Sequence, residues 1–181
     1  CQMGAVRLFQ RMPIASRKDV PAVCALARSI MKTELAKHPE MKAPEKWIGV
    51  GGTFTTLAAV VKGIPWTERT YMHGTTLTRG EVQAWADRLA DMPMEERLRL
   101  PGLQPHRADI VVHGICILLS AMERLGAGHG ERIRQSGRVS QAEISPSGRD
   151  LRVRPQCLPF VHKGKCRKKG NFLAISARHE V

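Results

Sequence analysis

The segment "KWIGVGGTFTTLAAVVKG" (residues 46–63) decides the fold of this chain. Its apolar start predicts a strand over 47–50, and two glycines then lead into an apolar helical pattern that lasts to about Val61. Gly63 predicts the end of that helix, and Pro65 prevents its continuation. A strand that passes through a glycine turn into a helix is typical of a layered α/β domain.

The Gly-Gly turn has the composition of a phosphate-binding loop. Glycine lets backbone amides approach a ligand closely, and the first turn of a helix carries unpaired amide donors and a partial positive charge. Thr53 and Thr55 either add hydroxyl donors or cap the helix. A glycine pair before a helix is more often a simple tight turn, so the motif alone leaves both interpretations open.

The residues on either side continue the alternation of strands and helices. In chain order, the predicted elements are a strand at 3–9, a helix at 19–37 with Asp19 as its N-cap, a strand at 70–77, a helix starting from the capping box Thr78–Glu81, a short helix within 92–109 and a buried apolar helix at 107–125. This order predicts one α/β domain over residues 1–126.

The positive charge is concentrated behind that domain. Residues 1–125 carry 17 basic and 12 acidic side chains, a net of +5, whereas residues 126–181 carry 12 and 4, a net of +8. The segment 127–181 shows no sustained period and is rich in Gly, Ser, Pro and Arg, which predicts an irregular, basic and disordered C-terminal tail. A non-enzymatic domain that binds phosphate or nucleic acid through this tail is the alternative function, and it is the weaker one.

The five cysteines favour a reducing, cytoplasmic location. They are scattered without a Cys-x-x-Cys pair, so neither a disulfide framework nor a zinc site is predicted. The longest apolar run, around 108–122, is interrupted by Asp109 and His113 and is too short to span a membrane. We expect no signal peptide, and the first residue, Cys1, suggests a fragment of a longer protein.

Three blocks occur in one order and at one spacing: "MGAVRL" (3–8), "IGVGGTFTTLAAV" (48–60) and the long stretch at 73–126 that contains "LPGLQPHRADIVVHG" (100–114). Together they closely resemble the exopolyphosphatase / guanosine pentaphosphate phosphohydrolase family of the actin-like ATPase superfamily. The resemblance covers residues 3–126. Actin-like sugar and acetate kinases share the glycine loop, but the block at 100–114 argues against them.

The resemblance implies an incomplete actin-like ATPase fold. In that family two ribonuclease-H-like halves enclose a cleft, and each half offers a glycine-rich phosphate loop. Carried over to this sequence, Gly51, Gly52, Thr53 and Thr55 look like the second loop. The chain therefore resembles the second, carboxyl-terminal half of the catalytic domain.

The same resemblance suggests roles for three further polar residues. Arg107 and Asp109 match the polar pair that opens the long helix of the family, and Arg107 is the candidate to offset phosphate charge. Asp109 equally suits the first turn of that helix, which is a structural role and the one we favour. Arg7, in the predicted first strand, is more typical of an ion pair than of a ligand.

The family reaction is the release of the terminal phosphate from inorganic polyphosphate or guanosine pentaphosphate. It uses a glutamate that activates water and Mg²⁺ as a helper, and the family places that glutamate upstream of the "GAVRL" strand. We therefore expect a hydrolase by family that is inactive as this chain alone, with no catalytic residue and no metal ligand identifiable in it. The sequence does not separate the two substrates, and a homodimer of the full-length protein stays open.

The tail departs from the family pattern. After "ERLG" the family continues with a strand and a Ser-Asp turn, which the residues here do not spell out. The stretch "GHGERIRQSGRV" (128–139) can be encoded so that a one-nucleotide shift reads as a β-branched strand followed by Ser-Asp. We therefore predict a frameshift near Gly126, which the underlying DNA sequence tests directly.

Overall fold

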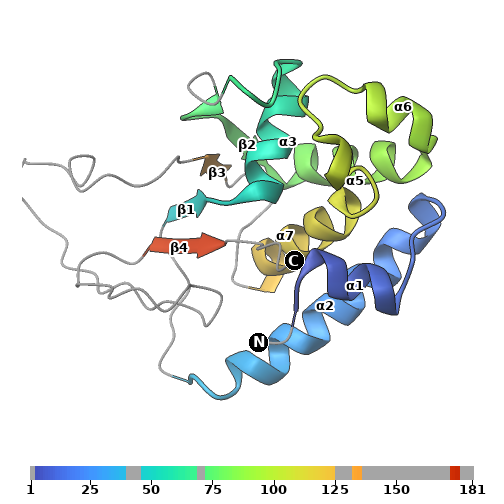
Figure 1. Cartoon of the computed structure of the whole chain (residues 1–181). Coiled ribbons are helices and arrows are strands. Elements are labelled where there is room, and N and C mark those ends of the chain that lie inside the picture. Colours follow the sequence, from blue (N-terminus) through green and yellow to red (C-terminus); the bar gives the residue numbers. More distant parts are fainter. Residues whose placement is uncertain (1–2, 40–45, 69–71, 125–131, 136–171, 176–181) are drawn as a thin grey trace, which may run out of the picture.

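The computed structural model describes residues 3–39, 46–68, 72–124, 132–135 and 172–175 (Figure 1). The elements are α1 (Ala5–Arg11), the 3₁₀ helix η1 (Arg17–Asp19), α2 (Val20–Leu35), β1 (Lys46–Gly49), α3 (Gly52–Lys62), β2 (Thr76–Thr78), α5 (Arg79–Asp91), α6 (Met94–Arg99), the 3₁₀ helix η2 (Pro105–Arg107), α7 (Val111–Arg124), β3 (Arg132–Gln135) and β4 (Phe172–Ile175).

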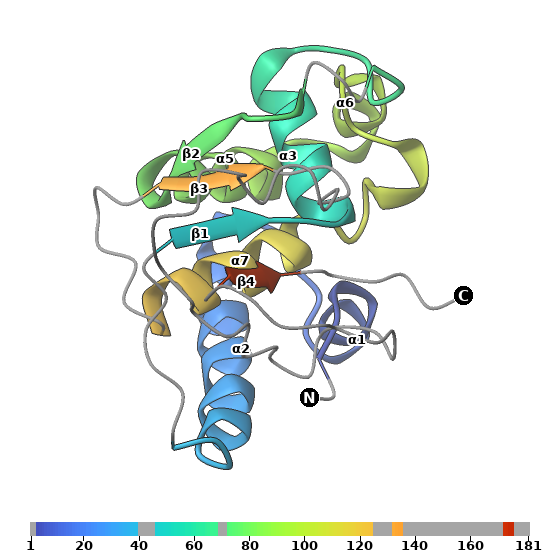
Figure 2. The ribbon, with the colours of Figure 1, turned by 90° about the vertical axis from the view of Figure 1, so that its left-hand side faces the viewer.

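The four strands form one mixed sheet in the order β2-β3-β1-β4. β1 lies between β3 and β4 and is parallel to both, so that Trp47 pairs with Ile133 on one side and with Leu173 on the other. β2 is antiparallel to β3. Figure 2 views this sheet with α2, α5 and α7 behind it, and the chain leaves the end of β1 toward α3.

Helix α7 is the centre of the core. Its apolar side chains surround the whole helix, and it packs against α1, α2, α3 and α5. This confirms the predicted buried helix, although α7 starts at Val111 rather than at 107. Ser120 fixes α2 to α7, because its Oγ donates to the Cys116 carbonyl at 2.7 Å and lies 3.0 Å from the Cys24 carbonyl.

The predicted strand at 3–9 is wrong, because these residues belong to helix α1. Leu8 on α1 is buried, and the helix packs on α7. His113 of α7 makes this contact specific: its Nε2 lies 2.9 Å from the Met12 carbonyl oxygen, and its ring meets the Phe9 ring edge-on at 5.4 Å. The period-two pattern here is too short to decide between strand and helix, and packing on α7 favours the helix.

The predicted strand at 70–77 is wrong at 72–75 and confirmed at 76–77, and residues 70 and 71 lie outside the described residues. Thr76–Thr78 forms β2, and the chain before it turns at Gly74, which has a φ of +77°. Met72 is fully buried in that turn. The following capping box is confirmed, because the Thr78 hydroxyl accepts from the Glu81 amide and the Glu81 carboxylate accepts from the Thr78 amide.

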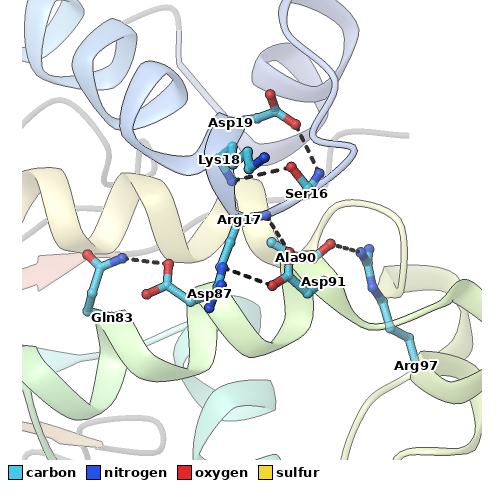
Figure 3. Close-up of polar contacts among 9 residues, drawn as sticks. All are labelled: Ser16, Arg17, Lys18, Asp19, Gln83, Asp87, Ala90, Asp91 and Arg97. Carbon is cyan, nitrogen blue, oxygen red and sulfur yellow. Dashed lines mark hydrogen bonds and ion pairs between the residues drawn. The ribbon is translucent and has the colours of Figure 1, made fainter.

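Asp19 precedes α2 as predicted, but its carboxylate serves the preceding turn. Its Oδ2 accepts from the amides of Ala15 and Ser16, each at 2.9 Å, and α2 itself has no side-chain cap. Figure 3 shows the Asp19–Ser16 contact beside a second link, in which Arg17 of η1 binds Asp91 at the end of α5. The backbone amide of Arg17 donates to Asp91 Oδ1 at 2.7 Å, and its Nε lies 3.2 Å from Oδ2.

Two segments of the predicted irregular tail are regular. Arg132–Gln135 and Phe172–Ile175 are strands β3 and β4, so the prediction is wrong for them. The rest of 127–181 lies outside the described residues, and a domain boundary at residue 126 and a frameshift near it stay predictions. In the described part of the chain, no helix has both the length and the apolar character needed to cross a membrane.

Candidate phosphate site

The turn between β1 and α3 is built by its glycines. Gly51 has a φ of +89° and a ψ of 179°, a backbone conformation that residues other than glycine rarely adopt. At Gly49 a Cβ atom would overlap the ring of Phe54, which is buried and folds back onto the end of β1. The two glycines therefore let the chain turn sharply from the strand into the helix.

The N-terminus of α3 keeps its first amides available. The first intrahelical hydrogen bond runs from the Thr55 amide to the Gly51 carbonyl at 3.0 Å, so the amides of Gly52, Thr53 and Phe54 precede the helical ladder. No side chain caps this end of the helix. Three amides and the positive end of the helix dipole therefore meet at one point.

Arg107 lies directly over this helix end. The terminal nitrogens Nη1 and Nη2 and the Cζ atom are the nearest neighbours that a Cβ atom on Gly52 would meet, and such an atom would overlap them. Nε donates to the Gln104 Oε1 at 2.8 Å, and partial burial lowers the pKa of Arg107. Among the described residues, neither Nη1 nor Nη2 has a hydrogen-bond acceptor.

The two threonine side chains contact neighbouring parts of the fold. Thr55 Oγ1 donates to the Gly51 carbonyl at 2.9 Å. The side chain of Thr53 packs against Gly114 on α7, where a Cβ atom would lie 2.5 Å from Thr53 Oγ1 and 2.9 Å from Thr53 Cγ2. The main donors that remain at the turn are the backbone amides and the guanidinium group.

The remaining two predicted residues lie elsewhere on the fold. Arg7 is exposed on α1, which is a helix and not the predicted strand. Asp109 is exposed and lies two residues before the start of α7, so it is not an acid of that helix's first turn. Of the predicted set, the structure therefore brings together Gly51, Gly52, Thr53, Thr55 and Arg107.

Two residues that organise the turn around Arg107 carry no direct signal in the sequence. Gln104 binds its Nε, as described above. Arg97 is only 8% exposed and donates to the carbonyls of Met92 at 2.9 Å, Ala90 at 3.1 Å and Ala108 at 3.3 Å. Figure 3 shows the bond to Ala90. Arg97 thus links Ala108, the residue after Arg107, to the end of α5. The desolvation that comes with this burial lowers the pKa of Arg97.

The donors at this turn fit an anion and not a metal ion. Mg²⁺ binds oxygen ligands, above all carboxylates, whereas the groups gathered here are N–H donors and a guanidinium cation. In the ranges that the structure describes, no three His, Cys, Asp or Glu side chains lie together as a metal-binding group. The described residues therefore do not form a site for the expected Mg²⁺, and we derive no step through it.

Taken together, these features define an α/β protein in which backbone amides and a guanidinium group gather at one helix N-terminus. Residues 1–140 match the model of the Ppx/GppA phosphatase family, and the chain belongs to that family.

Individual relatives agree with this membership. The chain is 24% identical over 119 residues to Exopolyphosphatase 2 of Mycobacterium tuberculosis, which covers 64% of this chain and 37% of the relative. It is similar to the crystal structure of the Aquifex aeolicus family member, with a TM-score of 0.62, 27% identity and coverage of 76% of this chain and 43% of that one. An exopolyphosphatase from Cytophaga hutchinsonii shares the fold, with a TM-score of 0.56, 20% identity and coverage of 76% and 44%. The chain thus spans less than half the length of each of these relatives.

Proposed function

We propose that this chain is the phosphate-binding part of a phosphoanhydride hydrolase, a ribonuclease-H-like half of an actin-like ATPase fold. One observation carries the proposal: the two acceptor-free terminal nitrogens of Arg107 lie over Gly52, where α3 begins with uncapped amides. A partly buried cation with open donors is satisfied best by an anion. Because the chain belongs to the phosphatase family, we infer that this anion is a phosphoryl group.

The site performs the part of the reaction that needs positioning and charge. In phosphoanhydride cleavage the transferred phosphoryl group spreads negative charge over its equatorial oxygens. The amides of Gly52 and Thr53 would bind one such oxygen, and the planar fork of Arg107 would bind two. These donors are fixed before the substrate arrives, so they need no reorganisation during the reaction.

Three of the described acidic side chains have structural partners: Glu81 caps α5, Asp91 binds Arg17, and Glu123 binds Arg28 at 2.9 Å. We nominate no described acidic side chain as the group that activates the attacking water. The family glutamate that activates water therefore stays a prediction for the complete enzyme. We expect this chain to bind the substrate without turning it over.

The proposed substrates are inorganic polyphosphate, which the name of the relative Exopolyphosphatase 2 supports, and guanosine pentaphosphate, which follows from the sequence resemblance. Both carry a terminal phosphoryl group on a phosphoanhydride bond, and the site as proposed binds that group. A cytoplasmic location and a homodimer of the full-length protein stay predictions.

Calorimetric titration of the whole chain with tripolyphosphate tests the proposal. We expect saturable binding that weakens about 30-fold in Arg107→Met, because charge-assisted hydrogen bonds are lost. Arg28→Met removes the same charge from a guanidinium that faces Glu123 on α7, so it is the matched control and should bind as the wild type does. Equal losses in both variants would reduce the effect to net charge and overturn the proposal.

A phosphate-release assay on the same samples tests the second part. No inorganic phosphate should appear above the buffer blank when polyphosphate is added to the purified chain. Release that disappears in Arg107→Met would show instead that the chain holds its own water-activating group.

A further inference from the structure

We propose that Gln104 is a positioning residue for the phosphate site, acting through Arg107. Its side-chain oxygen holds Nε and thereby directs Nη1 and Nη2 toward the bound phosphoryl oxygens. This inference rests on the proposed function and adds a residue whose own side chain need not touch the substrate.

The hydrogen bond fixes the orientation of both partners. Arginine has only donors, so the amide oxygen of Gln104, and not its NH₂ group, must face Nε. The bond is 2.8 Å long, and the same two residues are joined again by the Arg107 amide, which donates to the Gln104 carbonyl at 2.9 Å. Residue 104 is the N-cap of η2, and Arg107 is the last residue of that turn.

The two bonds leave Arg107 little freedom. A free arginine side chain loses rotamer entropy when it is fixed in one geometry. In this structure the Arg107 side chain is ordered before any ligand binds, because Gln104 holds its Nε. The backbone beside it is also held, since Arg97 donates to the Ala108 carbonyl at 3.3 Å. Preorganisation of this kind raises affinity without a new contact to the ligand.

The geometry also divides the guanidinium into a held side and a free side. Nε faces Gln104, whereas Nη1 and Nη2 lie against Gly52, where the uncapped amides of α3 begin. Two nitrogens that stay together at one edge can bind two oxygens of one phosphoryl group. Without Gln104 the same cation would still be present, but its orientation would be lost.

A double-mutant cycle with tripolyphosphate as the ligand tests this role on the whole chain. We expect Gln104→Met, which keeps the length and removes the acceptor, to weaken binding about fivefold. In the Arg107→Met background the same change should have no effect, because the group through which Gln104 acts is gone. A role confined to general stability would weaken binding in both backgrounds.

The matched control is Gln83→Met. Gln83 also makes one side-chain hydrogen bond, from its Nε2 to Asp87 on α5 at 2.9 Å, as Figure 3 shows. It should bind tripolyphosphate as the wild type does. Gln104→Asn, whose amide is one methylene too short to reach Nε, is the second variant and should reproduce the loss if Gln104→Met does not fold.

The Nε–H proton of Arg107 gives a readout independent of binding. Its NMR signal should be protected from exchange with water in the wild type and lost in Gln104→Met, while the thermal midpoint changes little.

The outcomes separate the two proposals. If the wild type does not bind tripolyphosphate, or Arg107→Met binds equally well, the proposed function fails and Gln104 loses its role with it. If Arg107→Met loses affinity but Gln104→Met and Gln104→Asn do not, or if their effects persist fully without Arg107, the proposed function stands and the role of Gln104 is overturned.

Discussion

The guanidinium of Arg107 lies so close to the Cα of Gly52 that no side chain fits between them. Gly52 comes from the first turn of α3, and Arg107 from the turn before α7, 55 residues later in the numbering. The absence of a side chain at residue 52 thus admits a cation to the helix end. Gly51 has the unusual backbone angle, whereas Gly52 is needed for space.

Gly52→Ala should therefore weaken phosphate binding while keeping the fold. The new Cβ overlaps only the far end of the Arg107 side chain, so the guanidinium is expected to move away and to give up its bond to Gln104. Tripolyphosphate affinity, measured by calorimetry, should fall about tenfold with the loss of oriented charge-assisted bonds. Gly80→Ala on α5 is the matched control, because its nearest side-chain atom, Thr78 Oγ1, lies 4.0 Å from the new Cβ. Unchanged affinity in Gly52→Ala would contradict the geometry described here.

Gly114→Ala should destabilise the fold through a single contact. Its Cβ would lie 2.9 Å from Thr53 Cγ2, and Thr53 is a β-branched residue with little rotamer freedom in a helix. We expect a loss of about 1–2 kcal/mol in the free energy of unfolding, measured with urea. The double variant with Thr53→Ala should regain most of this loss, since the clashing atoms are removed. If the double-mutant cycle shows no coupling free energy between residues 114 and 53, the two helices adjust their spacing without cost and the prediction is wrong.

Arg97→Met should destabilise the protein much more than a surface change. Three backbone carbonyls, those of Ala90, Met92 and Ala108, would lose their charged donor, and we expect a cost of about 3 kcal/mol or more. Arg99→Met, on the exposed side of the same helix, is the control and should cost less than about 0.5 kcal/mol. Urea unfolding curves that match for the two variants would show that the hydrogen bonds of Arg97 to Ala90, Met92 and Ala108 do not stabilise the fold.

His113 should make stability depend on pH. It is only 1% exposed, and its burial lowers the pKa of His113, with a smaller opposing effect from the Met12 carbonyl. The unfolded chain therefore takes up this proton before the folded one does. Stability is fully present above the ordinary histidine value of about 6.5 and falls as the pH drops below it, by at most about 1.4 kcal/mol per pH unit.

The pH effect is checked by urea unfolding at a series of pH values between neutral and mildly acidic. His113→Gln keeps a donor for the Met12 carbonyl but does not titrate, so its stability should vary less with pH than that of the wild type. Parallel pH profiles for the two proteins would rule out His113 as the source.

The glycine turn and its arginine could be predicted from sequence because both signals are local. Two glycines between a strand pattern and a helix pattern predict a turn at that place, and Arg107 lies in the block at 100–114 that carries the family resemblance. The capping box at Thr78 was predictable for the same reason, since its partners are three residues apart. The N-terminus of α7 was less predictable, because an apolar pattern does not show where its first hydrogen bond forms.

The missed features depend on contacts between distant segments. Residues 3–9 are short enough to suit either period, and only the surface of α7, more than a hundred residues later, selects the helix. The role of Gln104 depends on side-chain directions across a 3₁₀ turn. β3 (RIRQ) has no clear strand pattern, and β4 (FLAI) is an apolar run of only four residues within a polar, basic segment, so neither strand was predicted to pair with β1.

Both neighbours of β1 come from the last third of the polypeptide. During synthesis the helices can assemble early, whereas β1 can pair with β3 only after residue 135, and with β4 only after residue 175, has left the ribosome. The anchor of the glycine turn is thus completed last. A nascent or truncated chain that ends before residue 172 would contain every residue of the proposed phosphate site. It would still lack one of the two strands that hold β1, from which the glycine turn starts.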